Sequence, residues 1–408
     1  MKILIADDFQ KKYIEVLQAQ GHEVSFNPDL TAETLPSAIK DNDCLIVRGT
    51  KVTEQTIESS EKLSLIIRAG SGISTIDLDA AAKKAVFVTN TPARNSIAIA
   101  ELAFGLMISL DRKIPENVID LRNSKWNMKK YSEAQGLYEK TVGIVGMGEI
   151  GIEFADRAKA FGMNVIAFDP IALMNRPVAI STRLERKIFT FCNTLEEIAE
   201  LSDVITFHLP SNPHTKNMVN RDFLKHVKKN AIIINTSRGD IVDDDALIEA
   251  INSKNLRVGL DTFNGEPAKG DGKFESALSK HHNVYGTHHI GASTEQAQNA
   301  IAAEVIEIIT QYELGIVKYP VNIEMKPITR HILIARIYDK VGVFASILNL
   351  LKEQSISVQQ MDSKVFNGEI TQQIVLYLSK RPDNACIDAL SKLSDVIQIS
   401  VKSIISEK

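Results

Sequence analysis

The sequence predicts an α/β chain with two doubly wound parallel sheets, followed by a smaller α+β domain. Two series of short apolar runs alternate with amphipathic segments, which is typical of parallel strands joined by helices. A glycine-rich turn opens the second series, and the pattern changes to βαββαβ after a stretch that contains prolines. These three observations predict three domains in the 408 residues.

The first series of strands lies in the first quarter of the chain. Its apolar runs, each expected to form a strand, are 2–6, 23–26, 44–47, 63–67 and 86–89. The segments between these runs have helical spacing, so we expect one parallel sheet. Residues 97–111 are apolar on almost every side, which is typical of a helix buried between two bodies.

The second series contains six expected strands, at 142–145, 164–168, 203–209, 231–235, 257–261 and 283–286. Six strands with helices between them is the number in a complete dinucleotide-binding sheet. Residues 314–328 hold two prolines and lose periodicity, as a linker does. The remaining residues read as βαββαβ, which predicts a small α+β domain of a regulatory type.

The composition restricts the class of protein. With 44% hydrophobic and 24% charged residues, the chain can bury several cores, so disorder is excluded as its main state. The 47 basic residues against 51 acidic ones give a net charge of −4, which indicates neither nucleic acid nor an anionic membrane as a partner. The acidic start MKILIADD and the short apolar runs predict a soluble cytoplasmic protein. Cys44, Cys192 and Cys386 lack CxxC spacing, so we expect reduced thiols and no metal.

Residues 142–151, VGIVGMGEIG, place Gly146, Gly148 and Gly151 in G-x-G-x-x-G spacing between a strand and a helix. The first glycine allows a tight turn, the second lets backbone N–H groups approach a pyrophosphate, and the third allows close packing of the helix. Asp169 ends the next strand, where its carboxylate can accept from ribose hydroxyls and repel a 2′-phosphate. This pattern favours NAD over NADP. The alternative is a plain glycine-rich turn followed by a surface Asp.

Three further segments each place one reactive side chain after an expected strand: Arg238, Glu266 and His289. The carboxyl ends of parallel strands gather at one edge of a sheet, so we expect these three side chains to converge beside the cofactor. Each has an ordinary alternative: a surface ion pair, a loop acid before Pro267, and a loop pair formed with His288. Metal ligation by the two histidines would need a further spaced ligand, and none is evident.

The order of several motifs resembles a known family, the D-2-hydroxyacid dehydrogenases. The motifs are IIRAGSGISTID at 66–77, NTPARNS at 90–96, VGIVGMGEIG at 142–151, NTSRGDIVDDDAL at 235–247, LDTFNGEP at 260–267 and HHIGASTEQAQ at 288–298. The resemblance covers essentially the whole chain and is greatest to the phosphoglycerate dehydrogenases that end in an ACT domain. It implies a substrate-binding domain at 1–96 and 290–325, a Rossmann-like NAD-binding domain at 97–289, and an ACT domain at 329–408.

The resemblance also implies a role for each residue of the trio. Arg238 binds the substrate carboxylate and polarises the C2 carbonyl, His289 is the general base or acid, and Glu266 orients the imidazole. Hydride moves between C2 and the nicotinamide. The cofactor contacts implied are Gly146, Gly148, Glu149, Ile150, Gly151, Asp169, Thr236 and Asp261.

The N-terminal domain is implied to hold the rest of the substrate. The turn of Ser71, Gly72 and Ile73 offers backbone N–H groups to the carboxylate, and Arg48 and Arg68 face a phosphate. The alternative for the two arginines is solvated charge at strand ends. The chain departs from the family in four places: 45–52 is one residue shorter, Met128 replaces a common Arg, His288 replaces a common Pro, and 170–194 is longer.

The function implied is NAD-dependent oxidation of 3-phospho-D-glycerate to 3-phosphohydroxypyruvate, the first step of serine biosynthesis. The alternatives are a hydroxypyruvate or glyoxylate reductase, a 2-hydroxyglutarate dehydrogenase, and an NAD-sensing corepressor without turnover. We expect a homodimer or homotetramer. An amino-acid effector is possible at the ACT domain, but the loop 337–342 lacks the His of serine-inhibited relatives, and Ser357 replaces an Asn.

Overall fold

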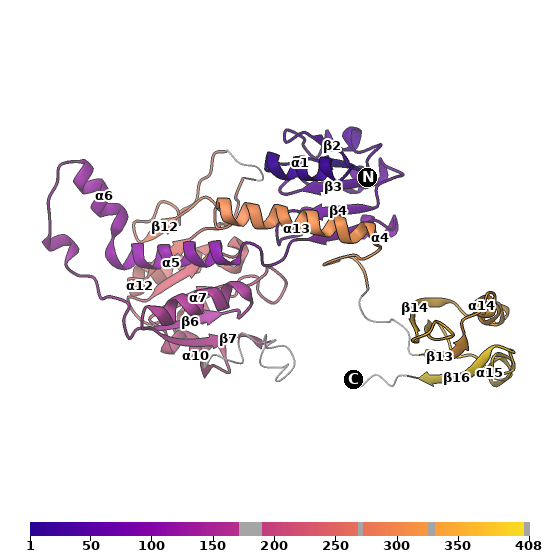
Figure 1. Cartoon of the computed structure of the whole chain (residues 1–408). Coiled ribbons are helices and arrows are strands. Elements are labelled where there is room, and N and C mark those ends of the chain that lie inside the picture. The colour runs from indigo at the N-terminus through magenta and orange to yellow at the C-terminus, as the bar shows by residue number, and fades with distance from the viewer. Residues whose placement is uncertain (171–189, 268–271, 325–330, 404–408) are drawn as a thin grey trace. The chain divides into compact units, whose positions relative to one another are not determined.

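The computed structural model describes residues 1–170, 190–267, 272–324 and 331–403 (Figure 1). These residues form two compact units, Met1–Asn322 and Ile323–Lys408. None of the described helices combines the length and the apolar character needed to cross a membrane. Most of the long stretch noted at 170–194 lies outside the described residues.

The first sheet of the larger unit has five strands, all parallel, in the order β2-β1-β3-β4-β5. Its strands and helices are β1 (Lys2–Ile5), α1 (Lys11–Ala19), β2 (Glu23–Phe26), α2 (Leu35–Ala38), β3 (Cys44–Val47), α3 (Glu54–Glu58), β4 (Leu65–Arg68), α4 (Leu78–Lys83) and β5 (Phe87–Asn90). Hydrophobic clusters pack on both faces, which is why the strands read as continuous apolar runs. The predicted parallel sheet is confirmed.

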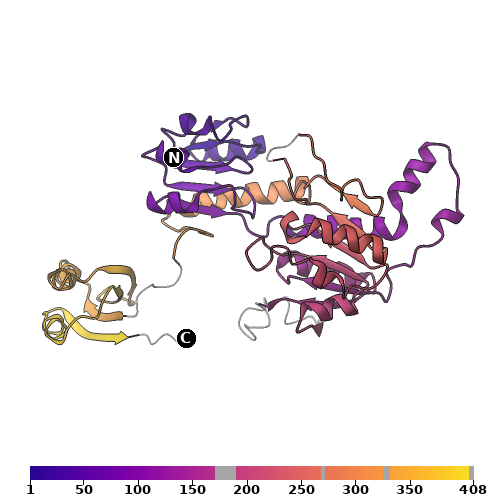
Figure 2. The same ribbon diagram turned by 180° about the vertical axis from the view of Figure 1, so that it is seen from behind.

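Two long helices join this sheet to the second one. The buried residues of α5 (Ser96–Arg112) belong to the core of the second sheet, whereas those of α13 (Glu295–Glu313) pack against the first. The orange α13 lies beside the first sheet in both views (Figure 1, Figure 2). After α13 the chain returns to β5, where the Val321 N–H donates to the Val88 carbonyl at 2.9 Å.

The second sheet has seven parallel strands in the order β12-β11-β10-β9-β6-β7-β8. Its strands are β6 (Thr141–Val145), β7 (Asn164–Phe168), β8 (Thr190–Phe191), β9 (Val204–Phe207), β10 (Ile232–Asn235), β11 (Arg257–Leu260) and β12 (Val284–Gly286). The order reverses between β6 and β9, which is the switch point where such sheets bind ligands. Six strands are as predicted. The seventh, β8, has only two residues and no periodicity for a sequence pattern to detect.

Helices cover both faces of this sheet: α7 (Glu149–Ala160), α10 (Leu195–Leu201), α11 (Arg221–Leu224) and α12 (Asp244–Lys254), with α5. Short 3₁₀ turns lie at Lys129–Tyr131 and Gly239–Ile241. Helix α6 (Ile114–Arg122) stands away from the sheet and has no buried residue (Figure 1).

The smaller unit contains a four-stranded antiparallel sheet in the order β14-β15-β13-β16. Its elements are β13 (His331–Tyr338), α14 (Val343–Glu353), β14 (Val358–Val365), β15 (Thr371–Leu378), α15 (Asn384–Ser391) and β16 (Val396–Ser403). Alternate residues of β13, among them Leu333 and Ile337, share one core with Ile347 of α14 and Leu390 of α15. Both helices therefore cover one face, and the predicted order βαββαβ is observed.

Candidate active site

The predicted trio lies at one edge of the second sheet. Arg238 follows β10, Glu266 follows β11 and His289 follows β12, and these three strands are neighbours that run in parallel. Their carboxyl ends therefore bring the three loops together. The fold thus brings together three side chains that are up to 51 residues apart in the sequence.

Glu266 and His289 form a hydrogen-bonded pair. The Nδ1 atom of His289 donates to Glu266 Oε2 at 2.7 Å, and the Phe263 N–H donates to Glu266 Oε1 at 2.5 Å. Burial by itself would raise the pKa of the Glu266 carboxyl, but these two hydrogen bonds and the charge of Arg238 hold it below its ordinary value. Glu266 is therefore a carboxylate at neutral pH. The His289 side chain is 51% exposed, which leaves its Nε2 atom accessible to a substrate.

Asp261, buried at the end of β11, fixes the backbone on both sides of His289. Its carbonyl accepts from the His289 N–H at 2.8 Å, and its carboxylate accepts from the N–H groups of Ile290 and Gly291 and from the Thr287 hydroxyl. His289 has a φ of 51°, a left-handed conformation that needs support from its surroundings. The observed contacts of Asp261 therefore position the imidazole, and a direct cofactor contact stays a prediction.

Asn235 shapes the loop that presents Arg238. Its buried side chain accepts from the Ser237 N–H at 3.0 Å and hydroxyl at 2.6 Å, and its amide donates to the Arg238 carbonyl at 2.8 Å. Gly239 then lies so close to the next loop that a Cβ there would be 2.2 Å from the carbonyl carbon of Phe263. This glycine brings the loop of Arg238 against the loop of Glu266.

The first sheet supplies a turn beside Arg238. A Cβ on Gly72 would lie 2.9 Å from Nη2 of Arg238, so the predicted turn of Ser71, Gly72 and Ile73 reaches the trio. The turn is held from the same sheet, since the Asn90 side chain donates to the Ser71 carbonyl at 2.8 Å.

The first sheet also contributes two further arginines. Arg48 follows β3, and Arg68 ends the neighbouring β4. Burial, then the charges of Arg238 and Arg48, lower the pKa of Arg68 to about 10, and Asp7 opposes the shift. The Nε atom of Arg68 is buried without a hydrogen-bond partner in the part of the chain that the structure describes. The charges of Arg48 and Arg238 thus both act on Arg68, and an anion bound beside it would relieve this repulsion.

The glycine-rich turn has the geometry that a dinucleotide needs. Gly146 has a φ of 96°, and a Cβ there would be 2.4 Å from the His208 carbonyl oxygen. A Cβ on Gly151 would be 2.2 Å from the Gly146 carbonyl oxygen, whereas Gly148 faces open space. Only glycine fits the first and third positions, and the second leaves room for a phosphate at the start of α7.

The remaining predicted cofactor residues surround this turn. Glu149 and Ile150 form the first turn of α7, and Asp169 Oδ2 accepts from the Met147 N–H at 2.9 Å. Thr236 is buried, and its hydroxyl has no hydrogen-bond partner among the described residues. The described residues therefore fit a dinucleotide.

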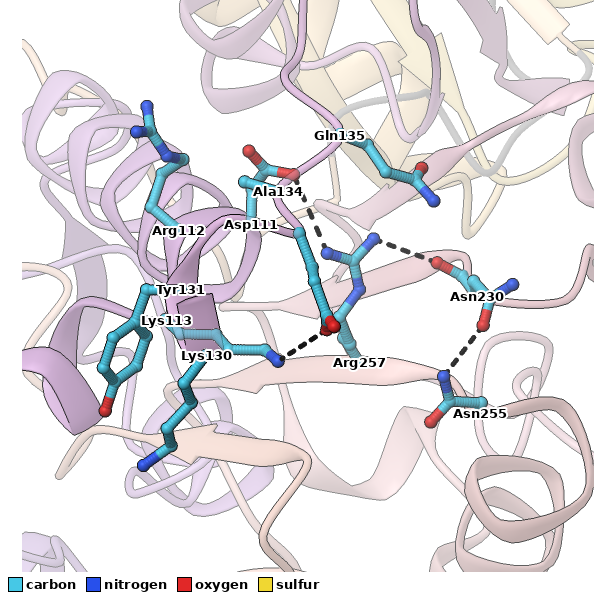
Figure 3. A pocket seen from close by; sticks show the side chains of 11 residues that line it. Asp111, Arg112, Lys113, Lys130, Tyr131, Ala134, Gln135, Asn230, Asn255 and Arg257 are labelled. Carbon is cyan, nitrogen blue, oxygen red and sulfur yellow. Dashed lines mark hydrogen bonds and ion pairs between the residues drawn. The ribbon is translucent and has the colours of Figure 1, made fainter. Parts of the chain in front are cut away.

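A separate hollow of about 150 Å³ lies at the amino ends of β10 and β11, away from the trio. Figure 3 shows Arg257 at its centre, with Nη1 3.7 Å from Asp111 Oδ1 and Nη2 donating to the Asn230 carbonyl at 3.0 Å. The Asn255 amide donates to Asn230 Oδ1 at 2.8 Å. These contacts tie the end of α5 to the starts of the two strands, which is a structural role.

Sequence patterns did not indicate two residues of the site, Asn235 and Asp7. Asn235 lies at the end of a predicted strand, and Asp7 lies two residues beyond β1. A polar residue at the carboxyl end of a parallel strand is the one signal that points to them. Their partners are fixed by the folded loops, which a sequence pattern does not contain.

Comparisons with known proteins agree with this site. Residues 104–291 match the family model described as the NAD binding domain of D-isomer specific 2-hydroxyacid dehydrogenases. The segment from residue 104 to residue 291 belongs to this family of dehydrogenases.

Two curated relatives carry the name D-3-phosphoglycerate dehydrogenase. The chain is 41% identical over 320 residues to the D-3-phosphoglycerate dehydrogenase of Methanocaldococcus jannaschii, covering 77% of this chain and 58% of that protein. It is 40% identical over 276 residues to the Bacillus subtilis enzyme of that name, covering 67% and 50%. The chain thus spans little more than half the length of these relatives.

Two solved structures extend the comparison to the fold. The NAD⁺-bound 3-phosphoglycerate dehydrogenase of Entamoeba histolytica has a TM-score of 0.65 at 28% identity, covering 80% of this chain and 99% of that one. A glyoxylate reductase from Paecilomyes thermophila has a TM-score of 0.68 at 26% identity, covering 79% and 98%.

Proposed function

We propose that the chain catalyses the NAD-dependent oxidation of 3-phospho-D-glycerate to 3-phosphohydroxypyruvate, the first step of serine biosynthesis. The observation that carries this proposal is that the charges of Arg48 and Arg238 both act on Arg68, while Arg238 also acts on the Glu266 carboxylate that is bonded to His289. A substrate with an anionic group at each end fits this arrangement. The names of the curated relatives support the same substrate.

In this mechanism Arg238 binds the substrate carboxylate and polarises the oxygen on C2. The Nε2 atom of His289 takes the proton of the C2 hydroxyl as the C–O bond becomes a carbonyl. The Glu266 carboxylate, already bonded to Nδ1, stabilises the imidazolium that forms. NAD, when bound, supplies the hydride acceptor for C2. Asp169 favours NAD, because its charge disfavours a 2′-phosphate.

The proposal includes the domain assignment: substrate binding at 1–96 and 290–325, NAD binding at 97–289, and an ACT domain at 329–408. The return of the chain to β5 after α13 supports the discontinuous first domain. The order βαββαβ supports the last. A cytoplasmic location belongs to the same proposal.

We further propose a homodimer or homotetramer. Helix α6 and the segment after it expose a group of large apolar side chains: Ile114, Val118, Ile119, Leu121, Trp126 and Met128. Trp126 is 83% exposed. Apolar side chains clustered in this way are typical of an interface, and a second copy of the chain is the partner that fits a symmetric enzyme.

Steady-state kinetics with a panel of substrates tests the function. The wild-type protein is assayed with NAD on 3-phosphoglycerate, glycerate and 2-hydroxyglutarate. We expect the highest kcat/KM for 3-phosphoglycerate. A higher value for either of the other acids would replace the proposed substrate while keeping the class of reaction.

A reductase of glyoxylate or hydroxypyruvate is the second candidate, since a solved glyoxylate reductase has the same fold. Assays in the reverse direction with NADH separate the two candidates. We expect 3-phosphohydroxypyruvate to be reduced with a higher kcat/KM than glyoxylate or hydroxypyruvate. The opposite order would favour the second candidate.

A further inference from the structure

Asp7 is hydrogen-bonded to the loop that contains Arg48. The residue follows β1, whose neighbour β3 leads into that loop. Asp7 Oδ2 accepts from three consecutive backbone N–H groups, those of Arg48 at 2.6 Å, Gly49 at 3.0 Å and Thr50 at 3.0 Å. Asp7 Oδ1 accepts from the Thr50 hydroxyl at 3.0 Å. One carboxylate therefore fixes all three residues of the turn.

The Asp7 carboxylate also acts on the charge of Arg68. Arg48 and Arg238 both disfavour the charged form of Arg68, whereas Asp7 favours it. With four hydrogen bonds, Asp7 holds this loop and places a negative charge at the same point.

We propose that Asp7 is a positioning residue that holds Arg48 opposite Arg68, so that the pair can bind the second anionic group of the substrate. This inference rests on the proposed function, because it concerns the phosphate end of the same substrate. Asp7 does not contact the substrate in this account. It acts through the backbone of the loop and through its charge.

The direct test replaces Asp7 and compares two substrates that differ only in the phosphate. In Asp7→Ala we expect KM for 3-phosphoglycerate to rise about tenfold or more, because the loop loses charge-assisted hydrogen bonds. KM for glycerate and Kd for NAD should change less than about twofold, since neither involves Arg48. Competitive inhibition by inorganic phosphate should weaken in parallel with the loss of 3-phosphoglycerate binding.

Two variants separate positioning from general damage to the fold. Asp7→Asn keeps an oxygen for the backbone N–H groups, and the Thr50 hydroxyl can reverse to accept from its amide, so this variant should lie closer to wild type than Asp7→Ala. Thr50→Val preserves the shape of a fully buried side chain and removes the hydroxyl that donates to Asp7, which also lies within hydrogen-bond distance of the Ala6 and Leu30 carbonyls. Three of the four bonds to Asp7 remain, so KM for 3-phosphoglycerate should rise by a smaller factor. Thr50→Val provides the test if Asp7→Ala does not fold.

The neighbouring Asp8 offers a matched control, because it is exposed and has no hydrogen bond or ion pair with the described residues. Asp8→Asn should match wild type with both substrates. Equal rises in KM for glycerate and 3-phosphoglycerate in Asp7→Ala or Thr50→Val would overturn the inference, as would wild-type values in both variants.

Failure of the inference is distinguishable from failure of the proposed function. A wild-type protein that does not oxidise 3-phosphoglycerate rejects the function. The inference is then tested by isothermal titration of inorganic phosphate into the wild type and Asp7→Ala. Weaker binding to the variant supports the role of Asp7, and equal binding contradicts it.

Discussion

The imidazole of His289 is held by one oxygen of Glu266 at 2.7 Å, and the lowered pKa of that carboxyl keeps the oxygen charged at neutral pH. His289→Ala should therefore reduce kcat by about 100-fold or more, because it removes the proposed general base. Affinity for NAD should remain, since the glycine-rich turn is unchanged. Kinetics together with NAD titration check both expectations. A fully active variant would assign the base to another group, such as His288.

Glu266→Gln tests the charge of the pair. In the proposed mechanism His289 takes up a proton during oxidation, and the negative charge of Glu266, 2.7 Å away, stabilises the imidazolium that forms. The neutral amide removes this stabilisation, so the low-pH limb of kcat/KM for oxidation should move to lower pH. A pH–rate profile of both proteins measures the shift. An unchanged limb would show that the pair does not control the ionisation seen in turnover.

Asp169 is the residue proposed to select the cofactor. Its carboxylate lies at the glycine-rich turn, bonded to the Met147 N–H. Asp169→Ala should reduce the preference for NAD, because the repulsion of a 2′-phosphate is lost. The ratio of kcat/KM for NAD to that for NADP measures the change. A wild-type protein that already prefers NADP would contradict the role.

At the scale of elements, the site depends on contact between the loops that follow β10 and β11. Gly239→Ala would place a Cβ 2.2 Å from the carbonyl carbon of Phe263, so the loops must separate. Arg238 and Glu266 lie on opposite sides of this contact, so separating the loops moves one side chain relative to the other. Misplaced catalytic groups lose rate steeply, and we expect kcat to fall about tenfold or more.

Gly105→Ala in α5 is the matched control for this change. A Cβ at Gly105 would have no neighbour within 4 Å, and alanine favours a helix over glycine by about 1 kcal/mol. The control should keep kcat and should not lower Tm. If both variants retain wild-type kcat, the contact between the two loops does not position the trio.

Most elements were predictable from the sequence because apolar periodicity is local. This periodicity predicts the two series of parallel strands, the βαββαβ order and the loops that carry Arg238, Glu266 and His289. The two-residue β8 was missed, since two residues have no period. The roles of Asn235 and Asp7 were missed because their hydrogen bonds join loops that meet only in the folded chain.

At the scale of the whole molecule, the smaller unit is the proposed regulatory part. Asp339, in the loop after β13, accepts from the Gln372 amide at 3.0 Å. Its charge disfavours the carboxylate of serine, and the loop 337–342 contains no histidine. We therefore expect weak inhibition or none when activity is measured from micromolar to tens of millimolar serine. Strong inhibition at low micromolar serine would refute this interpretation of the loop.

At this scale, the proposed mechanism requires that both sheets of the larger unit act on one substrate, and Arg68→Met tests this most directly. The measurement is the ratio of kcat/KM for 3-phosphoglycerate to that for glycerate, in the variant and in the wild type. A charge-assisted contact contributes about 1.5 to 3 kcal/mol, so the ratio should fall by about 10- to 150-fold. Equal losses with both substrates would contradict the account, because they would show that Arg68 does not bind the phosphate.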